Sequence, residues 1–259
     1  MSRSERGVAP TLVTGSVILL GWLLTSLVTA RIPGPVPTLK LLGQMIADGT
    51  ATTILGRTAL FMGVCFGIAA VAGVAVGLFI GTRPALDRGV SPYLAALQAM
   101  PTSLWIPVAA IVIGASVWSL GTVVALGAMP AVILGTRTAV KNVPPLLLRA
   151  GHTFGESGVS LLRRVVLPAA LPGILTGLEL GWSIAFRCLV AGEIFSGTLS
   201  GTGIGAVISR SKTTHDITEM LATIIVVLVL SVLVDRLAFA RVQHRLRQTR
   251  GLVDSGLPH

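Results

Sequence analysis

The stretch that decides the fold is Val140–Pro172, VKNVPPLLLRAGHTFGESGVSLLRRVVLPAALP, a polar interruption between two long apolar runs. It sets four basic residues against a single acid, Glu156, and it keeps apolar side chains among them. The basic residues are Lys141, Arg149, Arg163 and Arg164, and the apolar ones include Leu146, Leu147, Leu148, Phe154, Val159, Leu161 and Leu162. Mixed charge and apolar surface predict a short amphipathic helix outside the bilayer that presses on another protein.

Prolines and glycines in this stretch predict a helix, a bend and a second short helix. Pro144-Pro145 suits the first turn of a helix, where amide donors have no partner to lose. Turns or close backbone approach are expected at the glycines, Gly151, Gly155 and Gly158. Leu167-Pro168 and Leu171-Pro172 predict the end of the polar segment, because a residue before proline is pushed away from helical geometry.

The whole chain has the composition of an integral membrane protein. Hydrophobic residues make up 53% of the 259 and charged residues 12%, whereas a soluble domain carries about 25% charged residues. The formal charge of +10 sits in short connections between apolar runs, which favours a role in topology over nucleic-acid binding. Cys65 and Cys188 fall inside apolar runs and predict small buried side chains, with no disulfide and no metal site.

Six apolar runs predict an all-α protein with about six transmembrane helices. The N-terminal run exceeds the core of a signal peptide and is interpreted as a retained span of ~20 residues. The predicted spans are 11–30, 59–80, 93–114, 118–135, 173–195 and 220–239. The predicted organisation is a tail over 1–10, the first span, an outer loop with an amphipathic segment over 31–58, a core of five spans over 59–240 containing a polar loop over 141–170, and a basic tail over 241–259.

Several residues in these spans are candidates for lining a pathway. Span 93–114 carries Pro101 and Pro107 around Trp105 and is expected to be kinked, although Trp105 itself is expected to pack beside Pro107. Span 173–195 holds Glu179, Arg187 and Glu193, and charges at membrane depth default to a functional or pairing role. For Glu193 we favour an anchor for the 201–205 loop over a role in gating. Glycines repeated along 63–81 predict close helix packing, and glycines also recur every four residues over 173–181.

The distribution of basic residues predicts the orientation. With the N-terminus inside, 14 Lys and Arg fall on the inner side of six spans and 5 on the outer side. The positive-inside rule then places both termini and Val140–Pro172 in the cytoplasm.

At this point the sequence resembles a known family, the permease subunits of ATP-binding-cassette importers, in the nitrate, sulfonate, taurine and bicarbonate branch. The family's Glu-Ala-Ala motif corresponds to Arg149-Ala150-Gly151, its following glycine to Gly155, and its later Leu-Pro to 167–168. Supporting matches over about 41–248 are Met100-Pro101, Trp105-Ile106-Pro107, Met129-Pro130, 189–193, 203–205 and Asp235-Arg236.

The resemblance implies a MetI-like type I importer fold and a set of partners. These are a second permease copy, two ATPase subunits, an extracytoplasmic substrate-binding protein and membrane lipid. The loop would form a coupling helix seated on the ATPase, through Arg149, Ala150, Gly151, His152, Phe154, Gly155, Glu156, Ser157 and Leu161. The sequence has no Walker glycine-lysine loop, so ATP and Mg²⁺ would be bound by the partner, and we expect no cofactor, catalytic residue or metal in this chain.

Departures from the family pattern are informative. Arg149 replaces the motif's glutamate, Gly151 its second alanine and His152 the arginine that follows, so an acid on the ATPase is expected to pair with Arg149. Glu179 stands where the family has a basic residue, and Arg187 where it has an uncharged one. They are ~12 Å apart along one helix, so we favour contacts across the dimer or to another span, with an anionic substrate at Arg187 as the alternative.

Two other functions remain as alternatives. Gly155-Glu156-Ser157-Gly158 with His152 nearby matches the pattern of intramembrane serine proteases, but Ser157 is expected in a cytoplasmic segment instead of at membrane depth. An ATP-independent secondary transporter is the second alternative, and no inverted repeat of broken helices supports it. The sequence does not identify the substrate, and the resemblance implies a small, anionic solute of the nitrate, sulfonate or taurine kind.

Overall fold

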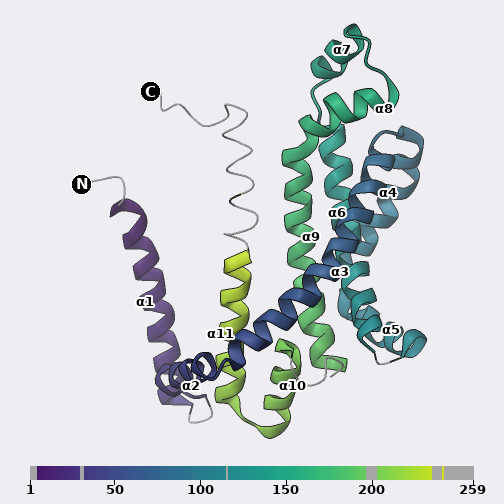
Figure 1. Ribbon diagram of the computed structural model, residues 1–259. Helices are drawn as coiled ribbons and strands as arrows, with labels where there is room; N and C mark the ends of the chain where they lie inside the picture. Colours follow the sequence, from purple (N-terminus) through teal and green to yellow (C-terminus); the bar gives the residue numbers. More distant parts are fainter. Residues whose placement is uncertain (1–4, 30–31, 115, 197–202, 235–240, 242–259) are drawn as a thin grey trace.

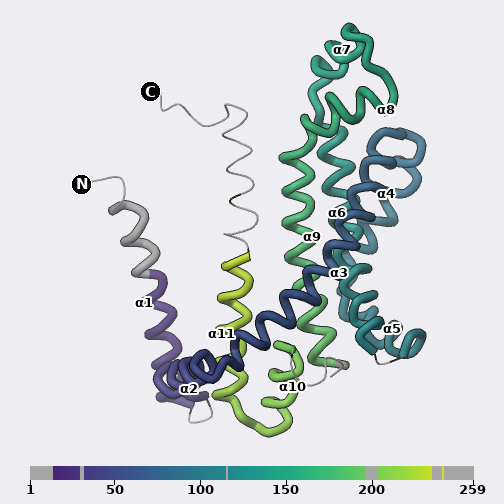
Figure 2. The backbone as a smooth tube through the Cα atoms, in the orientation of Figure 1, coloured from purple at the N-terminus to yellow at the C-terminus, as the bar shows by residue number. Residues whose placement is uncertain are grey.

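The chain is an assembly of helices, seen in a computed structural model that describes residues 5–29, 32–114, 116–196, 203–234 and 241 (Figures 1 and 2). Within these ranges there is no strand, which confirms the predicted all-α class. The end of the last predicted span beyond Val234, the Asp235-Arg236 pair, most of the basic tail and Gly201 lie outside the described residues.

The helices follow one another with short connections. The first half consists of α1 (Glu5–Val28), α2 (Pro35–Ala47), α3 (Thr50–Gly81), α4 (Pro84–Ala99), the 3₁₀ turn η1 (Thr102–Leu104) and α5 (Trp105–Ile113). The second half consists of α6 (Val117–Lys141), α7 (Pro145–Thr153), α8 (Gly158–Leu161), the π-helical turn η2 (Leu162–Val166), α9 (Leu167–Ser196), α10 (Ile204–Thr214) and α11 (Ile217–Val234).

The centre of the fold is α6, which packs between α3 and α9. Glycines on both neighbours permit this approach. A Cβ at Gly77 of α3 would lie 2.7 Å from Ile133 O, and one at Gly177 of α9 would lie 2.9 Å from Gly135 Cα. The predicted packing role is therefore confirmed for Gly73, Gly77 and Gly81, whereas Gly63 and Gly67 face open space. Gly173, Gly177 and Gly181 of α9 face α6 equally closely.

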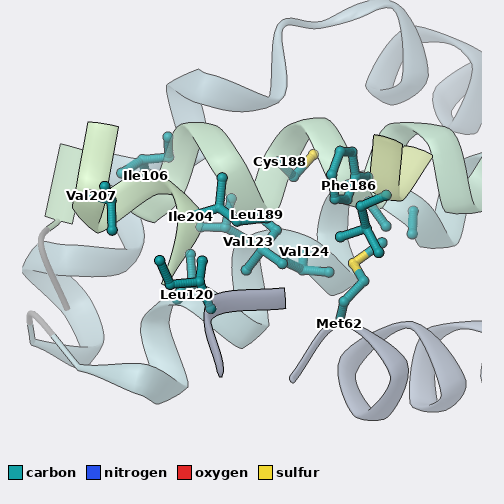
Figure 3. Packing of buried hydrophobic residues seen from close by; sticks show 14 of the residues in the cluster. Met62, Ile106, Leu120, Val123, Val124, Phe186, Cys188, Leu189, Ile204 and Val207 are labelled. Atoms are coloured by element: carbon teal, nitrogen blue, oxygen red, sulfur yellow. The ribbon is translucent and has the colours of Figure 1, made fainter. Parts of the chain in front are cut away.

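The apolar core lies where α6 and α9 meet the other helices (Figure 3). Val124 and Leu189 are fully buried there, and Ile204 at the start of α10 joins them. Cys188 is 2% exposed and Cys65 is half-buried, and both are free thiols, as predicted. The core thus ties α10 to the membrane-embedded bundle.

The span predicted over 93–114 is bent at Pro101, and the bend is a complete break instead of a kink. The structure has two helices, α4 and α5, bent by 85° across residues 100–101 and η1. Met100 is extended, with φ −70° and ψ 138°, because Pro101 follows it. The connection before α4 is short, since α3 ends at Gly81 and α4 begins at Pro84.

Prolines in the second half do not end helices as predicted. Pro168 lies in the first turn of α9 and Pro172 lies within it, and the helix continues to Ser196. The π-helical turn η2 directly precedes Pro168, and such a turn relieves the clash of a proline ring with the preceding turn. Val140–Pro172 is thus joined to the next span without a break after residue 158.

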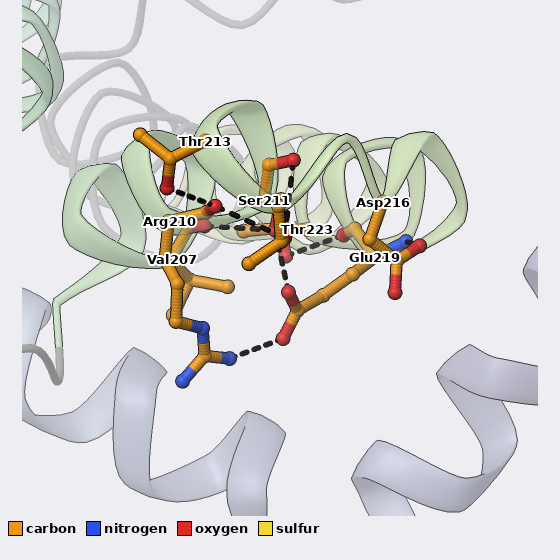
Figure 4. A network of polar contacts seen from close by, with 8 residues as sticks. Val207, Arg210, Ser211, Thr213, Asp216, Glu219 and Thr223 are labelled. Atoms are coloured by element: carbon orange, nitrogen blue, oxygen red, sulfur yellow. Dashed lines mark hydrogen bonds and ion pairs between the residues drawn. The ribbon is translucent and has the colours of Figure 1, made fainter.

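Two predicted loops also contain helices. The amphipathic segment expected over 38–57 is divided at Gly49, whose φ of +72° suits glycine, so α2 ends and α3 begins there. The outer segment expected as a loop contains α10, which pairs with α11 (Figure 4). Glu219 of α11 accepts hydrogen bonds from Ser211 Oγ at 2.6 Å and from Arg210.

Among the described residues, four helices are long and apolar enough to cross a membrane, and five if the bent pair counts as one span. These four are α3, α6, the continuous helix ending in α9, and α11. The described apolar part of α1, Thr14–Val28, is shorter. Together these segments correspond in position to the six predicted spans.

Candidate functional site

The candidate coupling segment is 145–166, which comprises α7, α8 and η2 and projects from the ends of α6 and α9 (Figure 1). The predicted helix, bend and second short helix are confirmed. Gly155 and Gly158 have φ of +80° and +53° in the bend, a backbone region that L side chains rarely adopt. The bend is further held by a hydrogen bond from Glu156 N to Gly151 O at 3.0 Å.

Gly151 is where α7 rests on the following helix. It is buried, and a Cβ there would lie 2.6 Å from Leu161 Cδ1 and 3.1 Å from Val165 Cγ2. Glycine in place of the motif's alanine therefore brings α7 close to α8 and η2. Most other candidate coupling residues are exposed around this contact, namely Arg149, Ala150, His152, Phe154, Gly155 and Ser157, while Glu156 and Leu161 are half-buried.

The coupling segment presents apolar surface to its surroundings. Phe154 is 86% exposed, Val159 79% and Leu146 75%. Beside them lies a hollow of about 570 Å³, lined by residues of α7 and the following helix, including Leu147, Phe154 and Val165. Arg164 Nη1 donates to Glu156 Oε1 at 2.5 Å on its rim. An exposed apolar patch rimmed by charge is typical of a protein–protein contact.

A second hollow, of about 690 Å³, lies between α9 and α11. Two of the candidate pathway residues, Glu179 and Arg187, line it together with Ser183 and Ser231. Arg187 Nε donates to Ser183 O at 3.1 Å, so its side chain folds back along α9 towards Glu179. This hollow lies between the helices of the fifth and sixth predicted spans.

The aromatic candidate lies elsewhere. Trp105 opens α5 and lines a small apolar hollow of about 110 Å³ with residues of α4 and α6, such as Leu97 and Met129. Pro107 is exposed on α5. Trp105 and Arg187 are therefore in separate cavities of this chain.

Glu193 lies at the end of α9 remote from the coupling segment and is fully buried. Gly205 N donates to its Oε2 at 2.5 Å, and a Cβ at Gly203 would lie 2.5 Å from its Oε1. This geometry agrees with the interpretation of Glu193 as an anchor for the start of α10. It places Glu193 in the core and not in either large hollow.

Sequence reasoning missed Asp87, which is 4% exposed in the first turn of α4. Its carboxylate accepts hydrogen bonds from Arg137 and Lys141 of α6, the latter at 2.6 Å, and from Ser91 Oγ at 2.7 Å. These cations are 50 and 54 residues further along the chain. The only sequence signal was an acid within a basic turn.

The geometry provides no support for an enzyme. Ser157 lies in the exposed bend before α8 and not within a helix. Within the described ranges, no three His, Cys, Asp or Glu side chains gather as a metal site would require. The features that the structure does show are an exposed apolar surface and a hollow lined by charged residues.

Comparisons with known proteins agree with this view. The chain is 28% identical over 171 residues to a putative ABC transporter permease protein of Methanocaldococcus jannaschii, covering 66% of this chain and 63% of that one. It is 25% identical to the nitrate import permease protein NrtB of Synechocystis, covering 90% and 87%. It is 31% identical to the taurine transport system permease protein TauC of Escherichia coli, covering 75% and 67%. The match to the Methanocaldococcus protein thus spans less than two thirds of that relative.

The fold also has a solved counterpart. A chain of the MetNI methionine ABC transporter in an inward-facing conformation superposes with a TM-score of 0.64 at 19% identity, covering 76% of this chain and 96% of that one. This confirms the predicted MetI-like fold. Residues 69–248 match the model of the binding-protein-dependent transport system inner membrane components, a family of transport proteins and not of enzymes. The chain belongs to this family of inner membrane components.

Proposed function

We propose that the chain is the pore-forming permease subunit of an ATP-driven importer, with the coupling segment as its contact to a separate ATPase. The observation that carries the proposal is the exposed apolar surface of 145–166, with Phe154 86% exposed at its tip. A side chain of this size is costly to leave in water and gains free energy when a partner's groove covers it. ATP and Mg²⁺ are bound by that partner.

In this proposal the assembly is a pair of permeases with two ATPases and a substrate-binding protein on the outer face. The coupling segment and both termini lie on the cytoplasmic side, supported by the excess of Lys and Arg there. Closure of the ATPases moves the coupling segment, and the bundle changes between two packed arrangements that open to opposite sides.

The solute we propose is a small anion. Two relatives are named for nitrate import and taurine transport. In this chain, Arg187 supplies a positive charge to the hollow between α9 and α11, with the hydroxyls of Ser183 and Ser231 beside it. A guanidinium suits a nitrate, carbonate or sulfonate group, although Glu179 also lines this hollow.

The contact with the ATPase is tested by Phe154→Ser. We expect the affinity of the permease for its ATPase to fall about tenfold or more, as for the loss of a central aromatic side chain from an interface. Phe195→Ser is the matched control, because Phe195 is 75% exposed at the opposite end of α9. Equal affinities for the two variants, measured by co-purification and titration, would contradict the proposed contact.

The solute is tested by ATP-driven uptake of labelled nitrate, bicarbonate and taurine into vesicles containing the complete assembly. Arg187→Gln is expected to lower uptake of the transported anion about tenfold, the loss of one charge-assisted hydrogen bond. Lys212→Gln, which removes an exposed cation outside this hollow, is the control. Uptake that needs an ion gradient and no ATP would instead establish a secondary transporter.

A further inference from the structure

The helix α4 is held in the molecule by charge more than by apolar packing. Asp87 is the one buried residue of its sixteen, all of which are described. Apolar side chains of α4 are exposed, including Tyr93 at 74% and Leu97 at 39%. A helix normally docks through a buried apolar stripe, so the contacts of Asp87 decide where α4 sits.

Those contacts fix α4 to one place on α6. Arg137 binds the carboxylate through two nitrogens, with Nη2 at 2.9 Å from Oδ2, in the bidentate arrangement that defines orientation as well as distance. Lys141 Nζ lies 2.6 Å from the same oxygen. Ser91, one turn further along α4, donates to Oδ1 at 2.7 Å.

The cations belong to the last turns of α6, directly before the coupling segment. Lys141 ends α6, and α7 begins at Pro145. Between them Val143 is buried, and it clusters with Val140 of α6, Val166 of η2 and Ala170 of α9. The end of α6 and the base of the coupling segment therefore form one packed body, and Asp87 attaches α4 to it.

The other end of α4 is free to bend. It meets α5 at 85° across Pro101, where the extended Met100 interrupts the helix. Beside this break the hollow lined by Leu97 and Trp105 has a volume of about 110 Å³. Space and a broken hydrogen-bond ladder are what a hinge requires.

We propose that Asp87 is a positioning residue that makes α4 move with the coupling segment, while the break at 100–101 takes up the motion relative to α5. A displacement of 145–166 would then reach the outer part of the bent pair through an ion-pair cluster. This inference rests on the proposed function for the force that displaces the coupling segment.

The test measures distances in the complete assembly with its ATPase. Spin labels are placed at Tyr93 of α4 and Ser160 of α8, and in a second sample at Tyr93 and Ile111 of α5, after replacing Cys65 and Cys188 by alanine. All three label sites are exposed. Each pair is measured without nucleotide and with a non-hydrolysed ATP analogue, in the native sequence and in Asp87→Asn.

In the native sequence we expect the 93–160 distance to be unchanged by nucleotide, while the 93–111 distance shifts. In Asp87→Asn the width of the 93–160 distribution should roughly double, since α4 has no other buried side chain to hold it. Exchange of the charges in Asp87→Arg with Arg137→Asp should restore a narrow distribution. If Asp87→Asn widened the distribution only by destabilising the whole bundle, exchanging the two charges would not make the distribution narrow again.

The proposal is overturned if nucleotide shifts the 93–160 distance in the native sequence, or if Asp87→Asn leaves its width unchanged. Comparing the 93–160 distribution of the native sequence with that of Asp87→Asn without nucleotide needs no ATPase. This comparison therefore tests the attachment of α4 even if the proposed function fails. Failure of the native permease to bind an ATPase would contradict the proposed function and leave that comparison intact. Glu219→Gln, which removes the ion pair between α10 and α11, should leave the width of both distance distributions unchanged.

Discussion

Two buried carboxylates stand at opposite ends of the bundle, and they are held in different ways. Asp87, beside the coupling segment, is bound by two cations and a hydroxyl. Glu193, at the far end of α9, is bound by one backbone amide, and its Oε1 has no partner among the described residues. The first acid is thus held by complementary charge and the second mainly by enclosure between glycines. The end that we propose to transmit force is the one with the fully satisfied ion pairs.

The largest effect is expected when the charge of Asp87 is removed. In Asp87→Asn the shape is retained, but Arg137 and Lys141 lose their counter-ion and an amide group faces one of them. Removing one partner of a buried pair costs about 3–5 kcal/mol, and partial exposure of the two cations, 25% and 47% of their side chains, places this variant at the lower end. Thermal unfolding in detergent should show a lower midpoint.

Glu219→Gln is the matched comparison for that loss. The Arg210–Glu219 pair is also an ion pair between two helices, but the Arg210 side chain is 59% exposed. Exposed pairs contribute about 0–1 kcal/mol. Equal shifts in the unfolding midpoint of the two variants would show that burial does not distinguish the Asp87 cluster.

A smaller effect is expected from filling the space around Glu193. In Gly205→Ala the new Cβ would lie 2.8 Å from Val190 O and 3.0 Å from Ile194 N, and it would also press on Glu193 Cβ. Backbone atoms cannot move away as a flexible side chain can, so we expect a loss of about 1–2 kcal/mol in unfolding free energy. Gly63→Ala, where nothing lies within 4 Å, should cost nothing. If both variants lost unfolding free energy, the cause would be the membrane surroundings of the glycines and not the enclosure of Glu193.

The sequence predicted the parts of this fold that depend on local patterns. Apolar runs of membrane length and the mixture of charge and apolar residues in Val140–Pro172 are each properties of a single stretch. Prolines were less informative. Pro101 breaks a helix as expected, while Pro168 and Pro172 do not. The π-helical turn before α9 is a local adjustment of the helix that no residue type predicts.

The charged residues also show that local sequence patterns predict only contacts within one stretch of the chain. Glu193 was identified because its partner Gly205 lies twelve residues away within one recognisable stretch. Asp87 was missed because Arg137 and Lys141 belong to another helix, and only packing brings them together. Arg187 and Glu179 were singled out for being charged at membrane depth, and the structure adds that both line one hollow. Which solute or partner copy fills it remains a prediction.

The smallest effect is expected from the same chemical change at the other acid. In Glu193→Gln the side-chain carbonyl can still accept the bond from Gly205 N, and a charge with a single hydrogen-bond donor is removed from the core. The cost of burying that charge offsets the weaker hydrogen bond, so the unfolding free energy should change by less than about 1 kcal/mol. The two acid-to-amide variants, measured side by side in detergent and in lipid, should therefore differ by several degrees in their midpoints. A loss at Glu193 as large as that at Asp87 would mean that Oε1 is bound in the membrane-embedded protein, and both ends would then be held by fully satisfied charge.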